Sequence, residues 1–355
     1  MLTPQHALER AQNLVSQAMT AGADAADAVY VCEASTEVQV RLGQLEDVAR
    51  SEGEDIGLRV FVGQRSATIS SSNMNPDILA GLVTRAIDMA KEAPEDQYAG
   101  LAPQDRLLTG SIPDFDSDDG LDPDPALLRA AALECEDAAR AVPGVSNSEG
   151  AGASAGRSIF ALATSHGFAG VKSGSGYSIS ASVLSGDDDA KERDYDWHSA
   201  RHMADLDSAA KIGTRAGERA VKRLNPGTVK SGQMPVVFDP RVGGSFVGHL
   251  LGGISGSAIA RKTSFLLESL GAQLFDSSIS IVDDPHRMRG LGSRAFDGEG
   301  LPTARRSIID KGVLTGWLME SASARQLGLE PTGHASRGTS GAPGVSPSNV
   351  HLEGG

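Results

Sequence analysis

The sequence predicts an α+β protein: antiparallel sheets flanked by helices in the N-terminal region, followed by a strand-rich C-terminal domain. Two observations support this class. Strand-like stretches come in runs instead of alternating one by one with helices. In addition, residues 1–92 and 126–224 share one order of elements, a helix, several strands and a second helix. This shared order suggests a duplication, although the two halves do not align residue by residue.

The first half begins with a helix, because Thr3 can serve as its N-cap and apolar residues recur at helical spacing as far as Gly22. Strand-like stretches follow at 28–40, 55–62 and 66–72. Glycines lie between them about ten residues apart, which is typical of an antiparallel meander with tight turns. They are Gly43, Gly53 and Gly63. A second helix is predicted after Asn75-Pro76, with one apolar face formed by Ile78, Leu82, Ile87 and Ala90.

Residues 93–125 are rich in Pro, Asp and Gly and are predicted to form a long loop. The second half then has a helix at 126–142, strands between 145 and about 201, and a helix at 206–224. Pro226-Gly227 marks the predicted domain boundary, which gives an N-terminal α+β domain, 1–227, and a strand-rich C-terminal domain, 228–355.

The C-terminal domain is predicted to open with a short buried strand at 236–238 and a glycine-rich helix at 241–259. Short strands separated by turns should follow at 279–282, 307–309 and 314–318.

Composition excludes several classes of protein. The 355 residues carry 32 Lys and Arg against 46 Asp and Glu, a formal net charge of −14, which argues against nucleic-acid binding. The N-terminus lacks the pattern of a signal peptide, and no apolar stretch is long enough to span a membrane. Two distant cysteines, Cys32 and Cys135, are expected to be reduced thiols. We therefore expect a cytoplasmic protein.

Few residues form a recognisable catalytic pattern. His198 and His202 have the i, i+4 spacing of metal ligands on a helix, but Ser199 stands where a metalloprotease has its Glu, and the surrounding alternation predicts a strand. Exposed histidines near a strand end are the alternative. The C-terminal region also offers polar candidates in turn-rich segments, namely Asp297, Arg305, His334 and Arg337.

Three C-terminal segments resemble the TldD/PmbA family, also called modulator of DNA gyrase. They are SSISIVDDP at 277–285, FDGEGLPTARRSIIDKGVLTGWL at 296–318 and PTGHASR at 331–337. The resemblance implies membership in a zinc-dependent protease complex of two homologous subunits that cleaves peptides or small unfolded proteins. In the TldD branch a helix carries the zinc motif HExxxH, and the PmbA branch, also called TldE, lacks it.

The corresponding helix of this chain does not complete that motif. It contains Val247, Gly248 and His249, but Leu250 stands in place of the Glu and Ile254 in place of the second His. One histidine cannot hold a catalytic zinc. The resemblance therefore implies a metal-free subunit without catalytic residues or a cofactor of its own, with zinc in a TldD-type partner. Asp297, Arg305, His334 and Arg337 are then candidates to face the peptide or the partner.

Two other hypotheses stay open. The chain could be a non-enzymatic adaptor or regulator that works as a homodimer without TldD, or an independent hydrolase that uses Asp297, His334 or the pair His198 and His202. The chain ends at Gly355, earlier than the family resemblance implies, so we expect a C-terminal domain shortened relative to the family.

Overall fold

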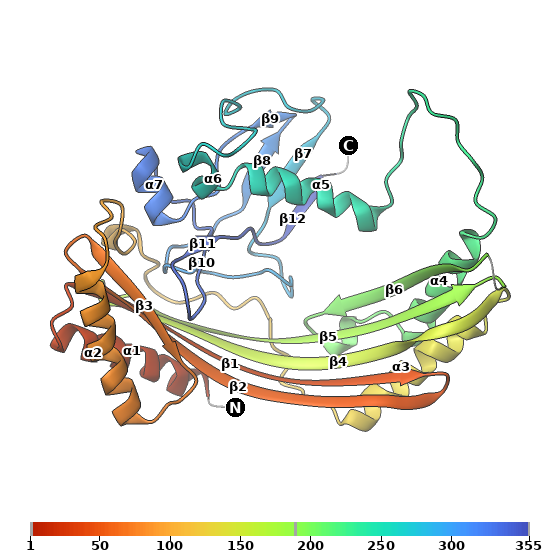
Figure 1. The fold of residues 1–355 in the computed structure, drawn as a ribbon, viewed down its shortest axis with the longest axis horizontal. Coiled ribbons are helices and arrows are strands. Elements are labelled where there is room, and N and C mark those ends of the chain that lie inside the picture. The colour runs from red at the N-terminus through yellow and green to blue at the C-terminus, as the bar shows by residue number, and fades with distance from the viewer. Residues whose placement is uncertain (1–2, 188–189, 354–355) are drawn as a thin grey trace.

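The computed structural model describes residues 3–187 and 190–353, and its largest feature is a curved antiparallel sheet with strand order β3-β2-β1-β4-β5-β6 (Figure 1). The α+β prediction is thereby confirmed. Four of the strands have 17 to 20 residues, far longer than the usual strand. The six strands are β1 (Ala25–Arg41), β2 (Gln44–Val62), β3 (Arg65–Ser71), β4 (Val145–Thr164), β5 (Ala169–Ser185) and β6 (Glu192–Ala200).

The sheet joins the two similar halves of the chain through its central strands. Each half has the order helix, three strands, helix, and β1 pairs antiparallel with β4 from Asp27↔Thr164 to Val40↔Ala151. The order of strands is therefore the same when it is read outward from the centre in either direction. The flanking helices are α1 (Pro4–Thr20), α2 (Pro76–Glu92), α3 (Pro125–Arg140) and α4 (Ala209–Lys222).

All four helices cover one face of the sheet, α1 and α2 at one end, α3 and α4 at the other (Figure 1). Alternate residues of the strands point into this core, many of them alanines such as Ala28, Ala153 and Ala161. Small side chains allow close packing, and α3 and α4 touch so closely that a Cβ on Gly213 would lie 1.9 Å from the carbonyl oxygen of Cys135.

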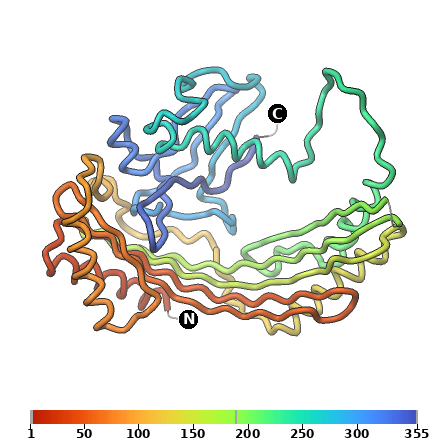
Figure 2. Tube along the Cα trace, viewed as in Figure 1, coloured from red at the N-terminus to blue at the C-terminus, as the bar shows by residue number. Residues whose placement is uncertain are grey.

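The C-terminal part of the chain packs on the opposite face of the sheet, which we call the open face. A linker of residues 225–239 leaves α4, arches away from the sheet and returns to α5 (Figures 1 and 2). A four-stranded sheet of order β12-β7-β8-β9 follows. The elements are α5 (Pro240–Gly253), α6 (Gly256–Ala260), β7 (Ser280–Asp283), β8 (Arg306–Asp310), β9 (Val313–Leu314), α7 (Ser321–Leu327), β10 (Ala335–Ser336), β11 (Gly344–Val345) and β12 (Val350–Glu353).

An apolar cluster joins the C-terminal part to the open face. Val29 and Leu162 of the sheet pack there with Phe168, Phe296 and Leu301. The loop between α2 and α3 also holds the C-terminal part in place. The guanidinium group of Arg325 in α7 donates hydrogen bonds to three backbone carbonyl oxygens of this loop at 2.8 to 3.0 Å. Short 3₁₀ turns, Gln104–Arg106 and Met203–Asp205, complete the helical elements of the described ranges.

Several predicted elements need correction. Gly53 lies inside β2 and not at a turn, because β2 begins eleven positions earlier than the stretch predicted at 55. The buried strand predicted at 236–238 is wrong: these residues lie in the linker, and Val237 is 97% exposed. The helix predicted at 241–259 ends at Gly253, and the strand predicted at 314–318 stops at Leu314.

Ile78 was predicted on the apolar face of α2, but it is half exposed near the start of the helix. The other three residues predicted on that face, Leu82, Ile87 and Ala90, are buried.

Candidate functional site

A buried ion network joins the sheet to the C-terminal part. Asp27 of β1 accepts hydrogen bonds from Arg59 of β2, with its Nε at 2.8 Å, and from Arg337, with Nη2 at 3.1 Å. All three side chains are buried. Burial by itself would raise the pKa of Asp27, but the charges and hydrogen bonds of the two arginines outweigh it and lower this pKa. Asp27 is therefore held as a carboxylate between two cations from distant parts of the chain.

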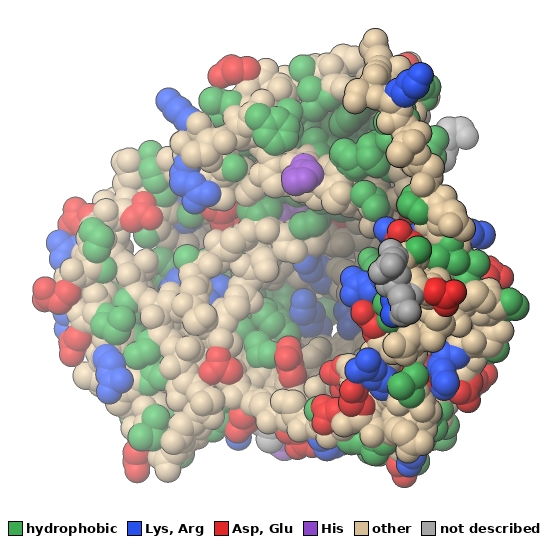
Figure 3. Space-filling view, turned by 45° about the vertical axis from the view of Figure 1, so that its right-hand side comes forward, with side chains coloured by type: hydrophobic (Ala, Val, Ile, Leu, Met, Phe, Trp, Pro, Cys, Tyr) green, Lys and Arg blue, Asp and Glu red, His purple; other side chains and the backbone are tan. Residues whose placement is uncertain are grey.

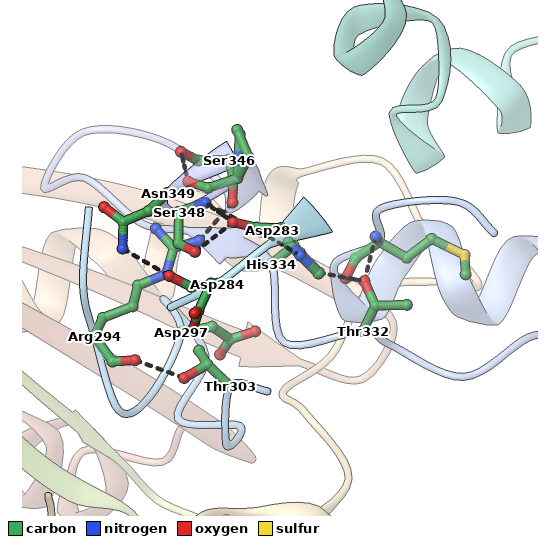
Figure 4. A network of polar contacts seen from close by, with 12 residues as sticks. Asp283, Asp284, Arg294, Asp297, Thr303, Thr332, His334, Ser346, Ser348 and Asn349 are labelled. Atoms are coloured by element: carbon green, nitrogen blue, oxygen red, sulfur yellow. Dashed lines mark hydrogen bonds and ion pairs between the residues drawn. The ribbon is translucent and has the colours of Figure 1, made fainter. Parts of the chain in front are cut away.

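A second network lies within the C-terminal part and contains a Thr-His-Asp chain (Figure 4). The Nδ1 atom of His334 lies 2.9 Å from Oγ1 of Thr332, and its Nε2 lies 3.0 Å from Oδ2 of Asp283. Asp283 also accepts hydrogen bonds from the backbone N–H and the hydroxyl of Ser348. His334 and Asp283 are buried, and the Thr332 hydroxyl contacts the backbone of Met319. The sequence of hydroxyl, imidazole and carboxylate resembles a catalytic triad. Here, however, each of these groups is hydrogen-bonded within the chain and holds neighbouring loops together.

Asp297 and Glu299 form a pair of buried carboxyl groups beside these networks. Asp297 accepts from the backbone N–H groups of Glu299, Leu301 and Ala335 at 2.9 to 3.0 Å, which fixes the loop FDGEGL. Glu299 accepts from the N–H and hydroxyl of Ser321. Burial raises the pKa of Asp297 and, together with the charge of Asp297, raises the pKa of Glu299 to about 7.

The structure places the four candidate residues of the sequence in two different settings. Asp297, His334 and Arg337 are buried and bonded within the chain, as described above. Arg305 alone among them is exposed, and it pairs with Glu353 of β12 at 2.5 Å. Their roles toward a peptide or a partner stay predictions, while in this structure the three buried residues hold loops of the C-terminal part in place.

The histidine pair does not share a helix face. His198 lies in β6, as the alternation predicted, and its Nδ1 accepts a hydrogen bond from the N–H of Asp207. His202 follows the strand and is buried, with Nε2 2.9 Å from the carbonyl oxygen of Asp116. The alternative of two exposed histidines is therefore wrong for His202, because the loop between α2 and α3 covers it.

The residues of α5 do not fit a zinc ion. His249 is exposed, whereas Leu250 and Ile254 are buried in the C-terminal core. The two positions that the family resemblance assigns to a Glu and a His of the zinc motif thus carry apolar side chains of the core. Within residues 3–187 and 190–353, no group of three His, Cys, Asp or Glu side chains is placed to hold a metal ion. No step of a reaction can therefore be assigned to a metal held by this helix.

Sequence reasoning missed three members of the buried networks, Asp27, Arg59 and Glu299. A usable signal existed for the first two, because each is a charged residue inside an apolar strand-like stretch, AADAVYV and IGLRVFV. A charge in such a place needs a partner. Glu299 lies in the segment at 296–318 that carries the family resemblance, but its spacing within that segment does not indicate that its side chain is buried.

Comparison with known proteins agrees with this architecture. Models of the PmbA/TldA metallopeptidase family match in three pieces: domain 1 at 26–90, the central domain at 118–224 and the C-terminal domain at 231–355. Fold and sequence thus place the chain among proteins of a metallopeptidase family. Metalloprotease PmbA of Escherichia coli O157:H7 is 33% identical over 330 residues, which cover 92% of this chain and 73% of that protein. The chain belongs to the PmbA/TldD family.

Other relatives support the same assignment. A Metalloprotease PmbA homolog of Haemophilus influenzae is 34% identical over 90% of this chain and 71% of its own length. A Bacteroides thetaiotaomicron structure that carries the name modulator of DNA gyrase superposes with a TM-score of 0.90 at 26% identity, over all of this chain and 78% of that one. TldE of Thermococcus kodakarensis, at 19% identity, shares the fold with a TM-score of 0.84 over 97% of this chain and 77% of its own. In the described part of the chain, no helix has the length and apolar character needed to cross a membrane.

Proposed function

We propose that this chain is the metal-free, PmbA/TldE-type subunit of a zinc-dependent protease complex, whose TldD-type partner supplies the zinc. The observation that carries the proposal is α5, where Leu250 and Ile254 take the positions of two zinc-motif residues and are buried in the core. A chain that keeps the family's fold but lacks the zinc-binding side chains can bind and position a peptide, while the hydrolytic chemistry belongs to the partner.

An exposed apolar surface supports a role as a subunit. It extends along the linker and α5, where Phe238 and Phe246 contact each other edge to face at 4.4 Å between ring centres. Apolar side chains gathered in this way on a surface are typical of protein interfaces. We call it the linker surface, and its exposed members are Val229, Met234, Val236, Val237, Phe238, Val242 and Phe246. A TldD-type subunit covers it in our proposal.

The peptide is proposed to bind at the edge of β6, next to the open face, by strand addition. The six-stranded sheet ends at β6, whose outer edge lies beneath the arch of the linker (Figure 1). The adjoining open face carries small and polar residues such as Gly152, Ser154 and Ser180. The edge of β6 can give backbone hydrogen bonds to an extended peptide on either side of Tyr195, whose own N–H and carbonyl oxygen are bonded to Asp194 and Arg241. Strand addition of this kind selects little among side chains. A peptide complex without a backbone ladder to either subunit would contradict this mode.

The experiment is a peptidase assay with zinc, using this chain, a TldD-type homologue and their mixture. Activity is expected only in the mixture. His249→Ala should leave that activity unchanged, because His249 holds no metal in this proposal. Activity of this chain alone that a chelator abolishes would overturn the proposal.

A matched pair of variants tests the linker surface. Val242→Asp in α5 and Val48→Asp in β2 introduce the same charge at sites of nearly equal exposure, 49% and 47%. Only Val242→Asp should prevent co-purification with the partner. A stable homodimer that Val242→Asp dissociates, without binding to the TldD-type chain, would instead favour the homodimeric adaptor.

The third hypothesis, an independent hydrolase, has little support. Asp297, His334 and His202 are buried, and their polar atoms bond within the chain. A general base must reach the proton that it removes.

A further inference from the structure

A cavity of about 660 Å³ lies between the open face and the C-terminal part, and basic side chains of four different segments line it. One of them, Arg157 of β4, is paired with Asp118, and in the part of the chain that the structure describes the other three are not paired with a carboxylate. Lys172 comes from β5, Arg201 directly follows β6, and Arg294 precedes the loop that holds Asp297. We call this space the cationic cavity. Figure 3 shows Lys and Arg side chains gathered inside the hollow between the C-terminal part and the sheet. This concentration is unexpected in a chain with a net charge of −14.

These three cations have no anionic partner among the described residues. Lys172 is exposed to the cavity, and its Nζ lies 4.8 Å from the centre of the Phe160 ring. Arg201 donates to the carbonyl oxygens of Ser175 at 3.1 Å and Leu291 at 2.5 Å. The guanidinium group of Arg294 donates to one acceptor among the described residues.

Arg294 donates to the carbonyl oxygen of Ser346 at 2.5 Å, and the Nε atoms of both arginines are buried without a hydrogen-bond partner. Unpaired buried donors are rare in folded proteins, and here they mark two guanidinium groups whose hydrogen-bonding capacity the described chain does not satisfy. Although the Lys172 side chain is exposed within the cavity, the surrounding protein limits its hydration. This desolvation, followed by the charges of Arg294 and Arg201, lowers the pKa of Lys172 to about 8.

The acidic groups around the cavity are already engaged elsewhere. Asp118 pairs with Arg157 at 2.9 Å. Asp297 is close enough for its charge to act on Lys172 and Arg294, but its oxygens accept backbone N–H groups. Asp114 lies on the exposed rim and accepts the N–H of Asp116. The contrast with Arg59 and Arg337 is clear, because those buried arginines share the carboxylate of Asp27.

We propose that the cationic cavity binds a carboxylate group of a peptide, and that Lys172, Arg201 and Arg294 surround this group. This inference rests on the proposed function, since it assigns to the same open face a preference among peptides. A peptide is favoured over a free small anion because apolar side chains line the cavity too, among them Phe115, Phe160 and Phe296. A carboxylate next to an apolar side chain matches both kinds of lining. The carboxylate can be the C-terminus or an Asp or Glu side chain.

Binding of labelled peptides to the purified chain alone tests the proposal by fluorescence anisotropy. Three peptides of one neutral sequence are compared: one with a free C-terminal carboxylate, one amidated with an internal Glu, and one amidated and fully neutral. We expect at least one carboxylate peptide to bind about 10- to 100-fold more tightly than the neutral one, and salt to weaken this difference. Which of the two binds more tightly identifies the source of the carboxylate.

Variants of Lys172 separate charge from shape. Lys172→Met should remove most of the preference for a carboxylate, Lys172→Arg should keep it, and Lys230→Met in the exposed linker is the matched control. Lys172→Met should also unfold at the same temperature as the wild type or a higher one, because it removes a cation without a partner. A drop of several degrees would mean that Lys172 has an internal role and would overturn the proposal.

Two further results would also overturn it: equal affinity for all three peptides, or tight binding of inorganic phosphate with no binding of either carboxylate peptide. Because this assay needs neither zinc nor the partner, its outcome is independent of the peptidase test. A preference for carboxylate peptides without peptidase activity in the mixture would overturn the proposed function but support the cationic cavity as a binding site. Peptidase activity in the mixture without a preference for carboxylate peptides would support the proposed function and overturn the proposal for the cationic cavity.

Discussion

Replacing Asp27 by Asn tests the network that joins the sheet to the C-terminal part. The change keeps the shape of the side chain but removes the negative charge between two buried guanidinium groups. The side chain of Arg337 is 0% exposed, so water cannot compensate for the lost carboxylate. Removing one partner of a buried ion network costs about 3–5 kcal/mol, and we expect the free energy of unfolding to fall by that amount at neutral pH.

The two tryptophans of the chain make the assay specific to each part. Trp197 lies in β6 and Trp317 in the C-terminal core, so the variants Trp317→Phe and Trp197→Phe each leave one fluorescent probe. Urea unfolding of Asp27→Asn should show a lower midpoint, with the probe at Trp317 changing first, because the C-terminal part loses a buried ionic attachment to the sheet. The control is Asp47→Asn, an exposed change in β2 that should alter stability by less than about 0.5 kcal/mol.

The pH dependence gives a second check with a definite sign. The pKa of Asp27 is lowered from its ordinary 3.8, so its contribution is present above that value and is lost as the pH falls. The difference between wild type and Asp27→Asn should therefore shrink in acid. A variant within about 1 kcal/mol of the wild type at neutral pH would refute the reasoning, because the two arginines would then not need the carboxylate.

Three further predictions concern single buried positions. Burial and a neighbouring carboxylate raise the pKa of Glu299 from 4.5 to about 7, so the stability that its protonated form contributes is complete below pH 4.5 and is lost as the pH rises through 7. Between about pH 4.5 and 8, the free energy of unfolding in urea should fall by about 3 kcal/mol more for the wild type than for Glu299→Gln. Parallel pH curves for the two proteins would contradict this. Gly57→Ala would place a Cβ 2.0 Å from the carbonyl oxygen of Thr339 and should lower the free energy of unfolding by about 1–3 kcal/mol. Gly53→Ala in the same strand has open space around its Cβ and should leave stability nearly unchanged. Equal thermal midpoints for the two variants would show that the backbone at Thr339 can move aside. Burial, with nearby acidic groups, raises the pKa of the Cys135 thiol to about 12, so a thiol reagent should modify it only after unfolding, and modification within minutes in native buffer would argue against it.

Local signals predicted much of the fold. Thr3 and Asn75 cap the helices that they were expected to begin, and both are followed by a proline at the first helical position. Gly43 and Gly63 have positive φ angles of 74° and 59° at the hairpin turns, where that conformation favours glycine. Gly53 was placed wrongly because glycine occurs inside strands as well as at turns, and spacing alone does not distinguish these uses.

The linker shows a different limit of sequence reasoning. The apolar stretch Val236–Phe238 was predicted to be a buried strand, since exposed residues of this kind are costly in an isolated chain. Pro235 and Pro240 on either side restrict pairing, and these residues are exposed instead. Composition cannot distinguish a residue buried in its own core from one that a second subunit would cover.

The candidate site was the least predictable part. Asp27 and Arg337 lie 310 positions apart, and no periodicity relates them. Alternation along a strand predicts on which face a side chain lies, but it does not predict which distant loop will meet that face. The same holds for the cationic cavity, whose cations Lys172, Arg201 and Arg294 come from β5, the end of β6 and the C-terminal part.

The pairing of β1 with β4 also affects how the chain can be made in a cell. β1 ends at Arg41 and its central partner begins at Val145, so about 100 residues must be synthesised before that edge can be covered. At about 5–20 residues per second, a ribosome leaves a strand of 17 residues with one unpaired edge for about 5–20 seconds. Two nascent chains on one messenger could pair through this edge, since it fits a sheet of the same kind. Production of this protein should therefore depend on translation speed and on chaperones that shield strand edges.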